Sequence, residues 1–185
     1  MHDVVAPDLD VLFCGINPGL YTAAIGHHFG RPGNRFWRVL HRAGFTPREL
    51  SPFEERELLR YGCGVTNLVN YATARADELD AEDLLRGGKR LARTVRRWRP
   101  RVVAVLGMDA YRAAFGKRNV AVGEQEERIA AARVWVLPNT SGLQASYQLA
   151  DLVRLFVRLR RASSGREGEG ARAPAERAHR VRARR

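Results

Sequence analysis

The stretch Asp80–Gly107, DAEDLLRGGKRLARTVRRWRPRVVAVLG, shows the pattern that decides the fold. Its first part repeats apolar and small residues at helical spacing, which predicts a long helix over residues 80–99. The residues on this stripe are Leu84, Gly88, Leu91, Val95 and Trp98. Its last part, residues 101–107, is a continuous β-branched run stopped by a glycine, as is typical of a buried strand. A helix that leads into a fully apolar strand indicates a parallel sheet covered by helices.

The same alternation continues on both sides of this stretch. Further buried strands are predicted at residues 11–14 and 133–137, and a short strand or buried loop at residues 65–69. Helices are predicted at residues 35–43, from Ser51 to near Gly62, at residues 108–115, and along a last stripe that starts at Leu149. Ser51-Pro52-Phe53-Glu54 has the form of a capping box with proline in the first turn. We therefore expect an α/β fold with three α/β/α layers, in which helices flank a central, mainly parallel sheet.

The charge of the chain points to a polyanionic partner. The 185 residues carry a formal net charge of +12, and the basic residues are almost all arginine. Nucleic acid is favoured over an acidic membrane, although a GC-rich genome can also favour arginine over lysine. No apolar run is long enough for a membrane helix, and residues 1–10 lack the features of a secretory signal. The two cysteines, Cys14 and Cys63, form no CxxC pair, so we expect buried thiols in a cytoplasmic protein.

The composition changes near residue 162. Residues 162–185 hold seven arginines and three glutamates but almost no large apolar residues, which predicts a disordered, Arg-rich basic tail. This tail is interpreted either as a solvated extension or as an arm that binds phosphates without sequence preference. Residues 1–161 are then expected to form one domain, which keeps a net charge of +8.

Two loops follow the carboxyl ends of predicted strands, which is where an open α/β sheet binds its ligands. The first is GINPGL, residues 15–20, and the second is LPNTSGL, residues 137–143. Each on its own is also ordinary turn or helix-capping chemistry. The first loop matches neither a dinucleotide fingerprint nor a phosphate loop. Leu143 stands out, because a large apolar side chain at a loop tip is unusual unless it packs against or wedges into something.

Together these loops resemble the mismatch-specific uracil-DNA glycosylase / thymine-DNA glycosylase family, and most closely its bacterial branch within the uracil-DNA glycosylase superfamily. Segments in matching order between the loops add to the likeness, which runs from about residue 10 to residue 159. They are RPGNRFW (31–37), GCGVTNL (62–68), Gly87-Gly88-Lys89 and Leu106-Gly107. The resemblance implies a monomeric, monofunctional glycosylase without metal or cofactor. Such an enzyme flips uracil or a related damaged base, such as ethenocytosine, out of a mispair with guanine in double-stranded DNA and hydrolyses its glycosidic bond.

The resemblance also assigns roles to individual residues. Asn17 matches the asparagine that positions the attacking water, and Asn139 stands where the leaving base is stabilised. The residues that match the base-binding wall are Ile16, Gly19, Thr22 and Phe29, with Phe29 as the stacking ring and Thr22 beside the C5 edge. The residues that match DNA contacts are Ser141, Gly142, Leu143, Asn34, Arg35 and Lys89, with Leu143 as the wedge that fills the vacated position.

Some residues depart from the family pattern. Thr140 and Ala145 stand where the bacterial branch usually has proline and arginine, which leaves the mispair selectivity open. His27 and His28 precede Phe29, and a solvated loop or a phosphate contact is favoured for them over catalysis. The preferred base is open among uracil, thymine, ethenocytosine and hypoxanthine, as is activity on single strands.

Two alternatives to a glycosylase are considered: a non-catalytic nucleic-acid-binding protein on the same fold, and a hydrolase of small nucleosides. Asn17 argues against the first. Leu143 and the charge of the domain argue against the second.

Overall fold

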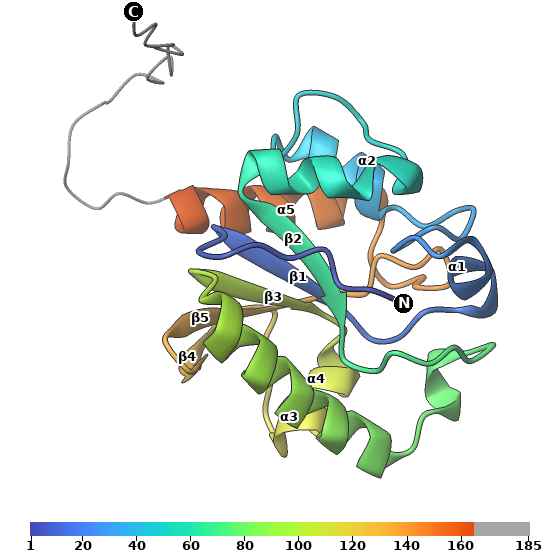
Figure 1. The fold of residues 1–185 in the computed structure, drawn as a ribbon, viewed down its shortest axis with the longest axis vertical. Coiled ribbons are helices and arrows are strands. Elements are labelled where there is room, and N and C mark those ends of the chain that lie inside the picture. Colours follow the sequence, from blue (N-terminus) through green and yellow to red (C-terminus); the bar gives the residue numbers. More distant parts are fainter. Residues whose placement is uncertain (165–185) are drawn as a thin grey trace, which may run out of the picture.

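The computed structural model describes residues 1–164, and these form an α/β fold with one five-stranded sheet (Figure 1). The strand order is β2-β1-β3-β5-β4. The strands are β1 (Val11–Gly15), β2 (Cys63–Asn67), β3 (Val102–Leu106), β4 (Gly123–Ile129) and β5 (Ala132–Leu137). β1 pairs in parallel with β2 and β3, and β3 pairs in parallel with β5. The expected mainly parallel sheet is confirmed.

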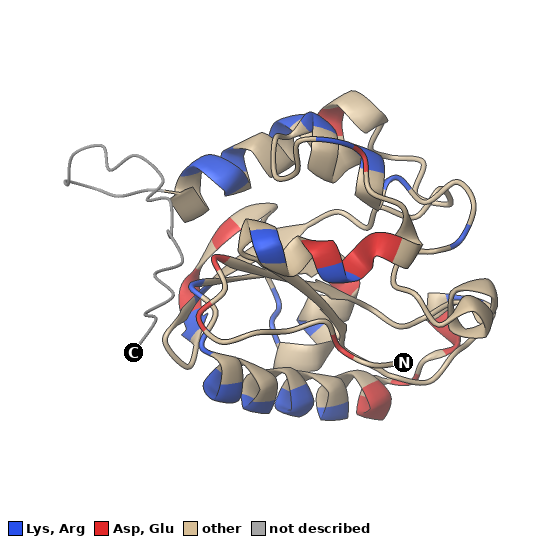
Figure 2. Cartoon of the chain, turned by 45° about the horizontal axis from the view of Figure 1, so that its top comes forward, with Lys and Arg blue, Asp and Glu red and all other residues tan. Residues whose placement is uncertain are grey.

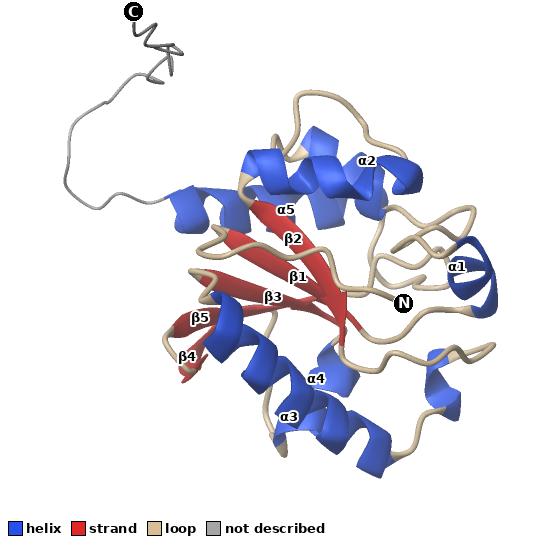
Figure 3. Ribbon diagram, viewed as in Figure 1, coloured by secondary structure: helices blue, strands red, loops and turns tan. Residues whose placement is uncertain are grey.

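Helices cover both faces of the sheet, which confirms the three layers (Figure 3). α2 (Phe36–Arg42) and α5 (Leu149–Ser164) lie on one side, with α3 (Ala81–Trp98) and α4 (Met108–Phe115) on the other (Figure 1). Shorter elements are α1 (Leu20–Ile25) and the 3₁₀ helices η1 (Pro52–Tyr61) and η2 (Ala76–Glu78). None of the helices within residues 1–164 is long and apolar enough to cross a membrane.

Each face of the sheet has its own apolar core, because successive residues of a strand point to opposite sides. On the α2 and α5 side, Phe13 packs edge-on against Phe36 and is stacked on Phe156. On the other side, Leu91 and Val95 of α3 are buried with the alternate residues of the strands. The helical stripe read from residues 80–99 is thus the face that α3 buries.

The boundaries of α3 follow from its sequence. Asp80 accepts a hydrogen bond from the backbone N–H of Asp83 at 2.7 Å, which satisfies one of the free donors of the first turn. Arg99 closes the helix in the left-handed conformation, and Pro100 follows it. Because Pro100 cannot continue the helix, the chain turns there into β3.

Three local features add detail to the predictions or differ from them. The helix expected from Ser51 to near Gly62 is a 3₁₀ helix over residues 52–61, and the backbone N–H of Ser51 bonds Glu54 as the capping box requires. β4 was not predicted, and it pairs antiparallel with β5. α5 continues through Ser164, past the expected domain boundary at residue 161, and buries Ser163. The rest of the predicted basic tail, residues 165–185, lies outside the described residues.

Candidate active site

The two loops singled out in the sequence meet in one cavity of about 570 Å³ at the carboxyl ends of the strands. Loop 15–20 forms one part of its wall, and residues 139–144 form another. The carboxyl end of β2 and residues 73–77 complete it. The predicted site residues in its lining are Ile16, Asn17, Gly19, Thr22, Phe29, Asn34, Asn139, Ser141 and Leu143. Parallel strands end at the same edge of a sheet, which is why segments about 120 residues apart come together here.

Asn17 is held with a defined orientation. Its amide nitrogen donates to Thr73 Oγ1 at 2.7 Å and to the carbonyl of Tyr71 at 3.4 Å. The Thr73 hydroxyl in turn donates to the carbonyl of Arg75 at 2.6 Å, so its oxygen accepts from Asn17. Because a carbonyl can only accept, Nδ2 must face this side, and Oδ1 is left as an acceptor at the cavity wall. No described residue hydrogen-bonds to that oxygen.

Three more asparagines line the cavity, and two present donors. Asn139 Oδ1 accepts from the backbone N–H of Ser141 at 2.9 Å, and Asn34 Oδ1 accepts from the backbone N–H of Phe36 at 3.0 Å. Both oxygens are thereby occupied, and neither amide nitrogen has a hydrogen-bond partner within residues 1–164, so both can donate. Asn67, at the end of β2, is only 4% exposed and also lines the cavity. The wall is therefore rich in neutral amide donors and acceptors.

Phe29 lies beside this amide wall. Its ring is stacked on Phe36, with centroids 3.9 Å apart, and its backbone is left-handed, with φ of 53°. Gly15 makes room for this arrangement, because a Cβ there would lie 2.5 Å from Asn67 Oδ1 and 3.2 Å from the Phe29 ring. Only glycine lets the ring and the amide approach the end of β1 so closely. Thr22 of α1 is 5% exposed and also lines the cavity.

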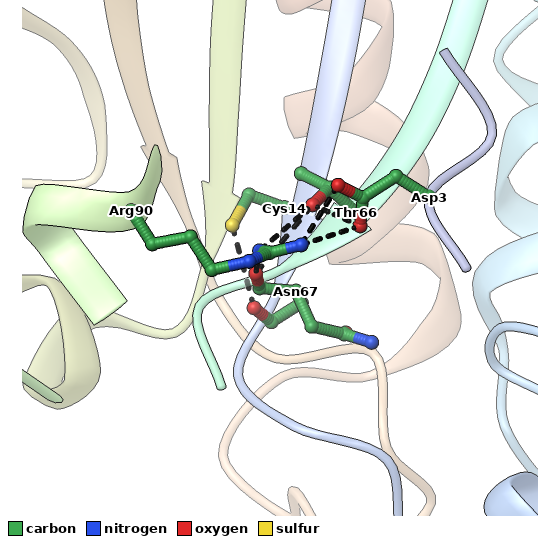
Figure 4. A network of polar contacts seen from close by, with 6 residues as sticks. Asp3, Cys14, Thr66, Asn67 and Arg90 are labelled. Carbon is green, nitrogen blue, oxygen red and sulfur yellow. Dashed lines mark hydrogen bonds and ion pairs between the residues drawn. The ribbon is translucent and has the colours of Figure 1, made fainter. Parts of the chain in front are cut away.

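A polar network behind the cavity supports the end of β2 (Figure 4). Arg90 of α3 donates to the Asn67 carbonyl at 2.6 Å and pairs with both carboxylate oxygens of Asp3, at 2.7 and 2.8 Å. Thr66 Oγ1 also donates to Asp3. Without Arg90, the carbonyl beside the Asn67 side chain would lose its charged donor. This places a guanidinium directly behind the cavity wall.

The histidine pair is not a solvated loop. His28 is 1% exposed, and its Nδ1 and backbone N–H lie 2.9 and 2.8 Å from Glu55 Oε2. His27 Nδ1 lies 3.1 Å from the other carboxylate oxygen. Burial alone would raise the pKa of Glu55, but the hydrogen bonds from His28 outweigh it and hold that pKa below its usual range. The favoured interpretation was therefore wrong for His28, because a carboxylate 27 residues away holds it inside the fold.

The residues predicted to contact DNA differ in their surroundings. Leu143 is 68% exposed at the tip of its loop. Gly142 packs against Gly33, because a Cβ on residue 142 would lie only 2.8 Å from the Gly33 carbonyl oxygen. The Arg35 guanidinium donates hydrogen bonds to four backbone carbonyls within residues 140–147. Lys89 is exposed on α3 and is not part of the cavity lining.

Lys and Arg positions recur along α3, where Figure 2 colours them blue. Within residues 1–164, the exposed basic residues of this helix that form no ion pair are Lys89, Arg93, Arg96 and Arg97. At the cavity itself, Arg75 is paired with Asp77, whereas Arg31 has no ion pair within residues 1–164. Arg31 was not identified from the sequence, because one arginine among the 30 in the chain carries no distinguishing signal.

Asn67 and Thr73 are further cavity residues that the sequence did not identify as functional. Asn67 could have been identified, since it is a polar residue at the carboxyl end of a buried strand, as are the loops at residues 15–20 and 137–143. Thr73 carried none, because its contact with Asn17 depends on how residues 68–75 fold back. Both cysteines are buried and free, as expected.

The arrangement defines an α/β enzyme-like domain with an amide-lined cavity, an aromatic wall and an apolar loop tip at the sheet edge. A family model named Uracil DNA glycosylase superfamily matches residues 2–160. The chain therefore belongs to the uracil-DNA glycosylase superfamily. Membership indicates a DNA glycosylase that acts on uracil in DNA, and it indicates DNA as the partner of the protein.

Proposed function

We propose that this protein is a monofunctional, mismatch-specific DNA glycosylase that starts base excision repair. Its substrate is uracil, or a related damaged base such as ethenocytosine, opposite guanine in double-stranded DNA. The observation that carries the proposal is the fixed orientation of Asn17, a cavity residue whose Nδ2 bonds Thr73 and Tyr71, which leaves Oδ1 free to accept. An amide oxygen can accept a hydrogen bond from water and aim that water at the sugar carbon, although it cannot remove a proton near pH 7.

The rest of the cavity supports the departure of a base rather than proton abstraction. Asp77 is the one carboxylate residue in the lining formed by residues 1–164, and it is exposed and paired with Arg75. The hydrogen bond from Arg75 lowers the pKa of that carboxyl, which makes it a weaker base. The free amide nitrogen of Asn139 can donate to the negative charge that develops on the leaving base. We therefore expect turnover slower than that of a site with a carboxylate in place of Asn17.

The flipped base is proposed to stack on Phe29, an interaction worth about 1–3 kcal/mol. Thr22 would then face its C5 edge, and this side chain is already buried, so space for a methyl group is small. Uracil should therefore be preferred over thymine. The amides of Asn34 and Asn67 offer neutral hydrogen-bond partners for the polar edge of the base.

The duplex is proposed to be held from the same edge of the domain. Leu143 would enter the position that the flipped base leaves, as apolar wedges do in other proteins that distort DNA. Arg31, free of an ion pair among the described residues, is the cation at the cavity that can reach a phosphate. One copy of the chain supplies all these groups, so we propose that it acts as a monomer.

A labelled duplex with a single G·U pair tests this function. The duplex is incubated with the protein and then treated with alkali. A break that forms only after alkali marks a monofunctional glycosylase, because an abasic site is left intact. Binding without any break would support the alternative, a non-catalytic nucleic-acid-binding protein on the same fold.

Substitution at Asn17 identifies the chemistry. Asn17→Ala should abolish turnover nearly completely and still bind the duplex, whereas Asn17→Asp should retain activity because a carboxylate can serve as a base. Asn119→Ala is the matched control, since Asn119 is exposed beyond α4 and outside the cavity. Activity of Asn17→Ala equal to that of the control would contradict the assignment.

A further inference from the structure

Loop 140–147 is folded around a single guanidinium. Arg35 Nη1 donates to the Tyr147 carbonyl at 2.6 Å, and Nη2 donates to the carbonyls of Ser141 and Gln144 at 2.8 and 3.0 Å. Nε donates to the Thr140 carbonyl at 3.4 Å, and the backbone N–H of Arg35 bonds the same carbonyl at 3.0 Å. Four carbonyls spread over eight residues thus converge on one side chain.

Besides Arg35, two contacts hold the first part of the loop: Thr140 Oγ1 donates to Asn34 Oδ1 at 3.0 Å, and Gly142 packs on Gly33. The loop's internal hydrogen bonds are short-range, such as the one from the Gln144 N–H to the Ser141 carbonyl at 3.0 Å. Carbonyl dipoles that point toward one centre repel each other unless a cation lies between them. Arg35 supplies that cation from a rigid position, because it is the N-terminal cap of α2 and the next two residues, Phe36 and Trp37, are buried.

The same contacts make Arg35 a poor phosphate ligand. A guanidinium has five N–H donors, and the bonds to the loop occupy four of them. A phosphate would have to displace carbonyls to form a two-pronged contact. These contacts favour a role for Arg35 other than the predicted direct DNA contact.

We propose that Arg35 is a positioning residue that gives loop 140–147 the shape in which Leu143 projects outward. This inference rests on the proposed function, in which Leu143 is the wedge. Lysine cannot substitute for Arg35, since one ammonium on a flexible stem cannot reach four carbonyls arranged around a planar fork. Arg35 acts through the loop and does not touch the reacting atoms.

A double-mutant cycle with Leu143 tests this coupling. Arg35→Met removes every donor but keeps a long stem, and Leu143→Ala removes the wedge. Single-turnover cleavage of the G·U duplex should fall about 10- to 100-fold for Arg35→Met, since misplacing a group by about 1 Å can cost on the order of 100-fold. In the Leu143→Ala background the same change should cost less than about 3-fold. Arg38→Met is the matched control, because Arg38 is exposed and makes only a 3.7 Å ion pair.

The conservative variant separates positioning from charge. Arg35→Lys should lose nearly as much activity as Arg35→Met and leave the salt dependence of duplex binding unchanged. A phosphate contact would behave differently, with Lys retaining most activity and Met lowering the salt slope by about 0.9. Equal factors in both Leu143 backgrounds, or that phosphate-like pattern, would overturn the proposal. Arg35→Lys replaces Met in the cycle if the Met variant shows no cooperative melting.

Amide hydrogen exchange tests the loop without relying on activity. Exchange within residues 140–147 should speed up in both Arg35 variants, while exchange in β1 and β3 stays as in the wild type. Unchanged exchange in the loop would refute the inference. Wild-type protein that leaves the G·U duplex uncut would instead refute the proposed function, and the exchange result would still decide the role of Arg35.

Discussion

Truncation of Leu143 to alanine should weaken DNA repair chemistry without weakening the fold. In the free protein 68% of Leu143 is exposed, so its removal from the loop tip should change the free energy of unfolding by less than about 0.5 kcal/mol. In the complex the side chain would be buried between bases. Removal of three carbon atoms costs about 2.4 kcal/mol on full burial, at about 0.8 kcal/mol per carbon.

The exposed fraction reduces this figure. Scaled by 68% exposure, the loss is about 1.6 kcal/mol. At about 1.36 kcal/mol per factor of ten, the flipped state should become about 15-fold less populated. Single-turnover cleavage of the G·U duplex, and the fluorescence of 2-aminopurine beside the uracil, should both report that loss.

Leu85→Ala provides the control, since Leu85 is 45% exposed on α3 and outside the cavity. It should leave both signals within about 2-fold of the wild type, as surface changes usually do. The wedge assignment fails if Leu143→Ala stays within the same 2-fold range, or if the two variants lose activity equally.

Three other variants test separate parts of the structure. Thr22→Ala should raise thymine excision relative to uracil excision in matched G·T and G·U duplexes, and an unchanged ratio would show that Thr22 does not limit the pocket. Glu55→Gln should lower the free energy of unfolding at pH 7 by about 2 kcal/mol, because it removes charge-assisted hydrogen bonds from His28. The pKa of Glu55 is depressed in the fold, so this advantage is present above about pH 4.3 and should vanish in chemical denaturation as the pH falls below that value. Deletion of residues 165–185 should flatten the salt dependence of duplex binding and leave single-turnover base preference unchanged, and a changed preference would contradict the division of labour between tail and domain.

The elements that could be predicted are those that a short stretch of sequence determines by itself. The stripe along residues 80–99 and the apolar run at residues 101–107 needed no distant partner to be read, and α3 and β3 were found there. The meeting of the two loops was also predictable, because parallel strands end at a common edge.

β4 could not be predicted for the opposite reason. Its sequence, GEQEERI, buries only its two ends, so it lacks the alternation that marks a half-buried strand. It is an edge strand, and its charged residues suit a position that must not recruit another strand. Its existence follows from pairing with β5, a tertiary fact that no local pattern contains.

Polar partners were the least predictable feature of the site. His28 was predicted to lie in a solvated loop, but it is buried against Glu55, which lies 27 residues later in η1. Arg35 was predicted to contact DNA, and its four acceptors in the fold could not be foreseen, since they lie more than 100 residues away. Sequence reasoning found residues that gather at the site, but not the protein groups that His28 and Arg35 bind inside the fold.

The two buried cysteines have a consequence for labelling the protein. Burial raises the pKa of the Cys63 thiol to about 12 and that of Cys14 further, so both stay protonated near neutral pH. A protonated, inaccessible thiol reacts slowly with maleimides and oxidants. A cysteine placed at an exposed loop position, such as Leu143→Cys, would then be the one fast-reacting thiol in the chain. A fluorophore attached there would follow the loop tip in real time, in otherwise unmodified protein.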